Sequence, residues 1–148
     1  MTRLFGYGTF RHPVWRAAIL GAEYPAEPAT LRGYCRIAAP SGYLSLRETT
    51  FDAASVDGVL IELDAIGWRI ADRWEEVPKY RRVAVVVDTP RGRADATAFL
   101  AANDDGAIPV DDDRHALIGD AEVEAAIVDF APLMRRLRGA GAPSDDGE

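Results

Sequence analysis

Along this chain, short segments rich in branched and aromatic residues recur between turn residues. In several of these segments apolar and polar positions alternate. That pattern predicts β-strands. The expected strands span residues 3–6, 29–39, 43–49, 56–64, 80–88 and 93–101. The turn Thr-Pro-Arg-Gly lies between the last two, which therefore predict a hairpin. We expect loops at 23–28 and 102–115.

Three segments predict helices instead. Residues 12–21 have a proline in the first turn and end in a glycine, which suits a helix from start to cap. Residues 65–76 have apolar side chains four positions apart, which predicts one buried stripe. From about Asp120 to Leu137 apolar residues share one face, with acids near the start and arginines near the end, as the helix dipole favours.

The succession of strands joined mostly by turns favours an α+β fold, with a small mixed or antiparallel β-barrel and a few surrounding helices. A doubly wound sheet is disfavoured because two or three helices are too few to alternate with these strands. We expect one domain over residues 1–138. The polar segment 139–148 predicts a disordered tail.

Charge and composition narrow the class of partner. The 148 residues carry a formal net charge of -7, which argues against nucleic acid and anionic membranes as partners. Cys35 is the single cysteine, so no internal disulfide can form. No segment has the 18 or so apolar residues of a membrane span. We expect a cytoplasmic protein, because a chain without disulfides suits a reducing compartment, and a monomer or homodimer.

The turn after the first strand is the first candidate for chemistry. Its sequence, Gly-Tyr-Gly-Thr-Phe-Arg at 6–11, has Arg11 where a dinucleotide fingerprint needs its third glycine, and the chain lacks a Gly-Lys-Ser/Thr loop. A carboxylate site remains open, since successive backbone N–H groups can hold an anion, Gly8 permits close approach and Thr9 could donate from its hydroxyl. A plain strand-to-helix turn is the alternative.

A pair of acids ends the predicted helix at 65–76. On a helical wheel Glu75 falls between Ala71 and Trp68, at the edge of the buried side, whereas Glu76 falls on the polar side. A carboxylate at a helix C-terminus and beside apolar surface should have a raised pKa, which suits a general base. We expect Glu76 to be a solvated surface residue, and the same interpretation is the alternative for Glu75.

Three motifs in order carry a family resemblance. "FGYGTF", "VDGVLIEL" and "ADRWEEVPKYRRVAVVV", over about residues 3–100, resemble the loop, glycine-containing strand and acid-containing segment of the gamma-glutamylcyclotransferase-like superfamily. Ala71 departs from the usual leucine, and Glu76 stands where the family commonly has glycine. The resemblance implies a small mixed barrel with helices outside.

The resemblance also implies a site. Backbone amides of the loop, here Tyr7, Gly8, Thr9 and Phe10, would hold the alpha-carboxylate of a gamma-glutamyl group, and Tyr80 would join them in binding substrate. Glu75, after the aromatic residue of the motif, would be the general acid/base. The spacing to Tyr80 also permits an alignment that puts Glu76 there.

The implied reaction releases 5-oxoproline and a free amine from a gamma-glutamyl-amine or gamma-glutamyl-peptide. It needs no cofactor or metal, and neither the two histidines nor the acidic run at 111–113 has the spacing of a ligand set. The alternative is a non-catalytic ligand-binding or interaction domain on the same fold. Residues 38–46 are expected to help shape the pocket for the leaving amine, with no specificity residue assigned.

Overall fold

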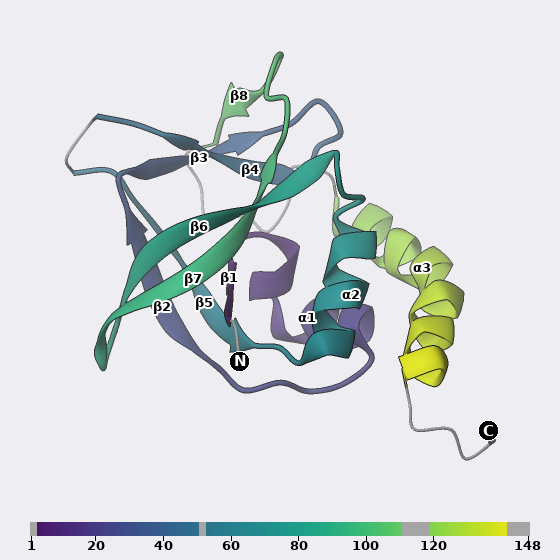
Figure 1. Cartoon of the computed structure of the whole chain (residues 1–148). Coiled ribbons are helices and arrows are strands. Elements are labelled where there is room, and N and C mark those ends of the chain that lie inside the picture. The colour runs from purple at the N-terminus through teal and green to yellow at the C-terminus, as the bar shows by residue number, and fades with distance from the viewer. Residues whose placement is uncertain (1–2, 51–52, 111–118, 142–148) are drawn as a thin grey trace.

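The computed structural model describes residues 3–50, 53–110 and 119–141. Five strands close a barrel in the order β1-β5-β2-β6-β7 (Figure 1). Their bounds are Arg3–Gly6 for β1, Ala26–Arg32 for β2, Ser55–Glu62 for β5, Tyr80–Thr89 for β6 and Gly92–Ala101 for β7. Neighbouring strands are antiparallel except for β1 and β7, whose parallel pairing at Leu4 and Thr97 closes the barrel.

A second sheet lies across one end of the barrel, at the top of Figure 1. It consists of β3 (Tyr34–Ala38), β4 (Leu44–Glu48) and β8 (Ile108–Pro109) in the order β4-β3-β8. Its apolar side chains join those of the barrel interior in one buried cluster. The small sheet therefore caps the barrel, as apolar burial favours.

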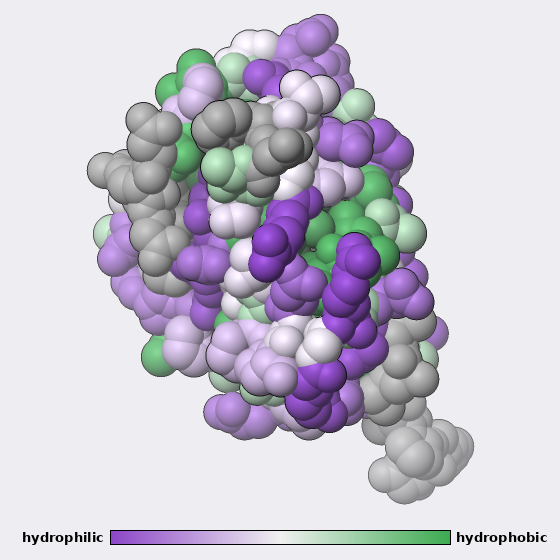
Figure 2. All heavy atoms as spheres, turned by 90° about the vertical axis from the view of Figure 1, so that its left-hand side faces the viewer, coloured by the Kyte–Doolittle hydropathy of each residue, from purple (hydrophilic) through white to green (hydrophobic). Residues whose placement is uncertain are grey.

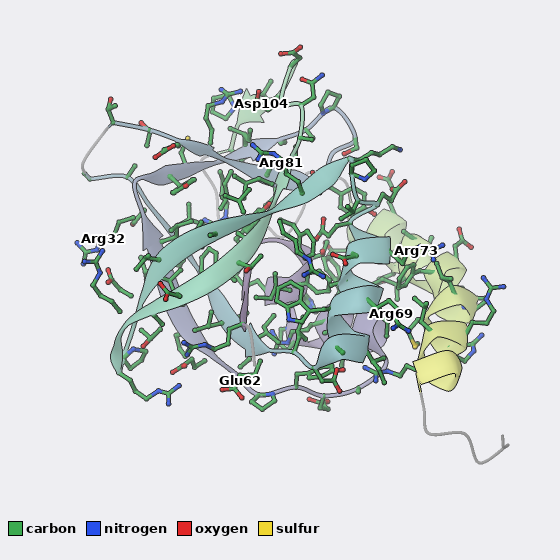
Figure 3. The ribbon with its side chains drawn as sticks, viewed as in Figure 1. Arg32, Glu62, Arg69, Arg73, Arg81 and Asp104 are labelled. Carbon is green, nitrogen blue, oxygen red and sulfur yellow. The ribbon has the colours of Figure 1, made fainter. Side chains whose placement is uncertain are left out.

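Three helices pack together along one side of the barrel, at the right of Figure 1. They are α1 (Pro13–Leu20), α2 (Ala65–Trp74) and α3 (Asp120–Gly141). Their apolar faces and the outer face of the barrel form a second buried cluster. The opposite side of the barrel is largely hydrophilic (Figure 2) and carries exposed ion pairs such as that of Arg32, labelled in Figure 3, with Asp88.

The expected α+β fold with a small mixed barrel is confirmed, and so is the hairpin of β6 and β7. The helix at 12–21 is also confirmed, and Gly21 ends it with a φ of 73°, a left-handed conformation that glycine adopts readily. The helix expected at 65–76 is shorter than predicted and ends at Trp74.

Four further predicted boundaries are wrong. The single strand expected at 29–39 is two strands from different sheets, because Gly33 turns the backbone with a φ of 84°. The first of them starts inside the expected loop at 23–28, and β8 lies inside the expected loop at 102–115. Helix α3 continues past Leu137 to Gly141, into the predicted tail, and residues 142–148 lie outside the described residues.

Gly58 shows why the barrel needs a glycine inside β5. A Cβ on Gly58 would collide with the carbonyl oxygen of Gly6 and would lie 2.8 Å from the ring of Phe5. Both neighbours belong to β1, so the missing side chain lets β1 and β5 approach at the point where the opening turn leaves the barrel.

We expect Gly58→Ala to lower the free energy of unfolding by about 1–3 kcal/mol, the usual cost of overpacking, in urea denaturation. Gly139→Ala is the matched control, because a Cβ there would meet no atom within 4 Å. In a helix that change should stabilise by about 0.5–1 kcal/mol. Equal stability of the Gly58→Ala variant and the wild type would contradict the close approach of β1 and β5.

Candidate active site

The opening turn becomes a single turn of 3-10 helix, η1 (Thr9–Arg11). Its backbone hydrogen bonds run from the N–H of Arg11 to the carbonyl of Gly8, at 3.0 Å, and from the N–H of His12 to the carbonyl of Thr9, at 3.2 Å. No side chain caps its start. The first N–H groups of a helix have no partner within the helix, so those of Thr9 and Phe10 can bind an anion.

Thr9 and Phe10 line a small cavity at the capped end of the barrel. Its volume is about 30 Å³, above the roughly 10–15 Å³ that a single water molecule needs. The lining residues come from β1, the opening turn, the start of β4, the end of α2 and β7: Leu4, Phe5, Gly6, Tyr7, Gly8, Thr9, Phe10, Tyr43, Leu44, Glu75 and Phe99. The fold thus brings together five of the six predicted site residues, from positions up to 68 residues apart in the chain.

The side chains of the turn are held by the protein itself. The hydroxyl of Tyr7 donates to the carbonyl of Phe99, and Thr9 Oγ1 accepts a hydrogen bond from Trp74 Nε1 at 3.3 Å. The side chain of Phe10 is buried in the cluster beneath the helices. A ligand in the cavity would therefore meet mainly the backbone of this turn, and Thr9 does not simply bond to its neighbours in the chain.

Helix α2 places Glu75 at its C-terminal cap, where the N–H of Glu75 donates to the carbonyl of Ala71 at 2.9 Å. Trp68 and Ala71 are buried, and Glu75 lies four residues after Ala71 on the same face. The helical wheel applies only as far as the cap of the helix, because Val77 lies beyond it and is exposed. Its assignment of Glu75 to the edge of the buried side agrees with the structure.

Burial, with a smaller contribution from the negative charge of Glu76, raises the pKa of Glu75 to about 8. The sequence argument expected the contribution of burial. Tyrosines around the carboxyl show the same environment, since burial and the charge of Glu75 raise the pKa of Tyr7 and of Tyr43. At neutral pH a carboxyl with this pKa is present in both forms, so it can accept or donate a proton.

Glu76 has a different environment one residue further on. Its side chain is exposed and forms an ion pair with Lys79 at 3.3 Å. Its backbone has a φ of 56°, in the left-handed region that favours glycine. The expectation that Glu76 is solvated is confirmed, although its partner is Lys79 rather than a residue of the helix.

A clamp between α2 and β6 holds the helix that carries Glu75. Arg82 donates two hydrogen bonds to the carboxylate of Asp72, at 2.9 and 2.7 Å. The same guanidinium lies 4.5 Å from the centre of the Trp68 ring. A bidentate ion pair fixes orientation as well as distance, so Asp72 and Arg82 set the position of the helix end relative to the barrel.

The sixth predicted site residue, Tyr80, lies in a second cavity beside the first. Its hydroxyl donates to the carbonyl of Leu44 at 3.0 Å. This cavity has a volume of about 420 Å³. Its lining comes from the loop before β4, the segment from the end of α2 to the start of β6, and α3: Ser41, Tyr43, Arg73, Trp74, Glu75, Glu76, Lys79, Tyr80, Ala126, Asp129 and Phe130.

Several of these lining residues were not singled out from the sequence. Ser41, Tyr43 and Leu44 line one or both cavities and fall in the segment 38–46, whose expected part in a pocket for the leaving amine stays a prediction. Phe130 was assigned only to the apolar face of the last helix. The sequence carries no signal that this helix reaches the site, because its contact with α2 is a tertiary one.

No group of three or more metal-ligating side chains occurs within the described residues, and the acidic run at 111–113 lies outside them. Within the same part of the chain, no helix is both long and apolar enough to cross a membrane.

Comparison with known proteins identifies the family. Residues 4–120 match the model of the family described as gamma-glutamyl cyclotransferase, AIG2-like. The chain belongs to this family. The matched residues include the opening turn, Glu75 and Tyr80, and they end where α3 begins. A search of curated protein sequences found no match for this chain.

Solved structures of other proteins share the fold. One is the solution structure of an Arabidopsis thaliana protein, 20% identical, with a TM-score of 0.60 over 99% of this chain and 95% of that one. A structure titled gamma-glutamyl cyclotransferase is 14% identical, with a TM-score of 0.60 over 99% and 92%. An uncharacterized Homo sapiens protein is 16% identical, with a TM-score of 0.60 over 97% and 89%. At these identities the likeness shows the fold alone.

The raised pKa of Glu75 predicts a pH dependence of stability. The folded protein holds the Glu75 proton up to about pH 8, whereas the unfolded chain releases it near pH 4.5, so the folded state binds more protons between these values. Stability is therefore lost as pH rises through this window. We expect Glu75→Gln to gain stability relative to wild type as pH rises from 5 to 8, in urea denaturation at several pH values.

Glu76→Gln is the control for that measurement, because it removes an exposed carboxylate and keeps Glu75. It should retain most of the loss of stability that wild type shows. A difference between wild type and Glu75→Gln that stays constant with pH would show that Glu75 titrates normally.

Proposed function

We propose that this protein is a gamma-glutamyl cyclotransferase that releases 5-oxoproline and a free amine from a small gamma-glutamyl-amine or gamma-glutamyl-peptide, with Glu75 as the general acid/base. One observation carries the proposal: a carboxyl with a pKa near 8 lines the same small cavity as the opening turn. The family of the chain supports the class of reaction.

The opening turn would hold one end of the substrate. Thr9 and Phe10, whose N–H groups have no partner within the turn, line a cavity of about 30 Å³, which has room for a carboxylate group rather than a whole substrate. Backbone donors on a rigid turn keep that carboxylate in place while the rest of the molecule bends. Such positioning can supply on the order of 7–11 kcal/mol in a well-oriented ring closure.

Glu75 would carry out the proton transfers. Its carboxylate takes a proton from the alpha-ammonium group of the substrate, and the free alpha-amine attacks the gamma-carbonyl carbon. A new C–N bond closes the five-membered ring, and the protonated Glu75 gives its proton to the leaving nitrogen as the bond from that carbon to this nitrogen breaks. The ring nitrogen then releases its second proton to the carboxylate of Glu75, which passes it to the departing amine or to water. A group whose pKa lies near the working pH suits these steps.

The backbone at Glu76 supports the choice between the two acids. The family pattern commonly has glycine directly after its acid/base glutamate, and the residue after Glu75 has the left-handed backbone that glycine adopts most readily. Glu76, in contrast, is exposed and paired with Lys79. Both observations favour Glu75 as the acid/base residue.

We expect Glu75→Gln to lower the rate of 5-oxoproline release by more than the 10²–10⁴-fold typical of one general acid–base residue, because the same group serves twice. The measurement is 5-oxoproline release from a panel of gamma-glutamyl amines and peptides. Ligand binding should survive, because the opening turn and not Glu75 would hold the alpha-carboxylate.

Glu76→Gln is the control and should keep most of the activity. It also removes a charge that raises the pKa of Glu75, so the rise of kcat/KM with pH should move to lower pH. An inactive Glu76→Gln beside an active Glu75→Gln would reverse their roles. If wild type binds gamma-glutamyl compounds but releases no 5-oxoproline, the non-catalytic binding domain is the better description.

We expect Gly8→Val to abolish binding of gamma-glutamyl ligands while the protein stays folded, since a branched side chain would block approach to the backbone of the turn. Calorimetry with Glu75→Gln as the parent protein separates binding from turnover. Circular dichroism controls for folding. Unchanged affinity in a folded Gly8→Val protein would exclude the turn as the carboxylate site.

A further inference from the structure

The second cavity is too large to be a mere extension of the first. It measures about 420 Å³, within the range of small-molecule sites, and opens between the end of α2, the loop before β4 and α3. Both cavities are lined by Tyr43 and by Glu75. The carboxyl that has the raised pKa therefore lies where the two cavities meet.

The reaction assigns different parts of the substrate to the two sides of Glu75. This step rests on the proposed function. If the alpha-carboxylate lies against the opening turn, the gamma-carbonyl must lie near Glu75, and the nitrogen that receives the proton must lie within its reach. The body of the leaving amine, that is, the substituent on its nitrogen, then extends away from the first cavity. The second cavity is the space on that side.

The lining of the second cavity indicates the chemistry of that body. Trp74 makes edge contacts with two other aromatic residues of the lining, with ring centres 6.2 Å from Tyr43 and 5.3 Å from Phe130. Tyr80 adds a fourth aromatic side chain. Rings in edge contact favour another flat apolar group beside them.

The charged residues of the lining do not favour a charged body. Lys79 is paired with Glu76 at 3.3 Å, and Arg73 and Asp129 add one charge of each sign. Figure 3 shows Arg73 on the side of α2 that is turned toward α3, and its side chain is exposed. The charges of these four residues cancel, and the remaining acid of the lining, Glu75, lies where the two cavities meet and is assigned to the reacting nitrogen rather than to the body of the amine.

We propose that the second cavity is the subsite for the leaving amine, and that it takes an amine whose body is neutral and aromatic. Helix α3 forms one wall through Ala126, Asp129 and Phe130. These residues lie beyond the segment 4–120 that matches the family. The part of the chain that selects the amine is thus partly separate from the part that holds the gamma-glutamyl group.

The test compares two substrates that differ in the body of the amine, gamma-glutamyl-phenethylamide and gamma-glutamyl-ethylamide. We expect kcat/KM for 5-oxoproline release to be about tenfold or more higher for the phenethylamide, as hydrophobic pockets discriminate at this level. Phe130→Ala should remove most of that preference and change the rate with the ethylamide by less than about twofold. Comparing the two substrates in each variant cancels their intrinsic reactivity.

Two further variants sharpen the test. Val128→Ala is the matched control, because Val128 belongs to the same helix, is exposed and lies outside the cavity lining, so it should change neither rate. Ala126→Phe should fill the cavity and exclude the phenethylamide while sparing the ethylamide. It tests the subsite even if Phe130→Ala fails to fold.

The outcomes separate the two proposals. Turnover of the ethylamide without any preference for the phenethylamide would overturn the subsite and leave the proposed function standing. Faster release from gamma-glutamyl-putrescine or gamma-glutamylglycine than from the phenethylamide would overturn the neutral aromatic body. An equal loss with both amides in Phe130→Ala would make Phe130 a structural residue. Absence of 5-oxoproline from every substrate would overturn the proposed function, and the subsite with it.

Discussion

The carboxyl group of Glu75 is desolvated at the end of α2, where two cavities meet. The opening turn, α2 and β6 are held in place around it. Burial of a carboxyl disfavours its charged form, which is why the pKa of Glu75 is raised to about 8. The burial results from tertiary contacts. Ala71 and Trp68 are buried beneath the helix, and the opening turn lies against its end through the hydrogen bond from Trp74 to Thr9.

The contacts that hold this arrangement come from distant parts of the chain. Arg82 on β6 clamps Asp72 on α2, and Gly58 on β5 lets β1 approach closely enough to deliver the turn to the same place. Each contact involves a residue of one of the three family motifs. Two of the motifs line the small cavity, through the opening turn and Glu75, and the third supports the turn through the close approach of Gly58 to β1.

The two cavities that meet at Glu75 suggest a division of labour in the proposed reaction. The small cavity has fixed backbone donors and room for a carboxylate group, whereas the large one is lined mostly by side chains. Backbone donors are the same for any side-chain composition, so the small cavity can bind the same carboxylate group throughout a family. Side chains such as Phe130 can change without disturbing the barrel, so the large cavity can select among amines.

The sequence by itself determined the family, the order of the main elements and the two segments that meet at the site. The spacing of apolar residues and the positions of turn residues are local properties of the sequence. For this reason the hairpin at 80–101 and the helix that ends before Glu75 could be predicted. The tertiary structure decided what depends on distant contacts: that residues 26–38 form two strands in different sheets, and that α3 forms one wall of the larger cavity. It also decided how far burial raises the pKa of Glu75, because desolvation depends on which atoms surround the carboxyl and not on its neighbours in the chain.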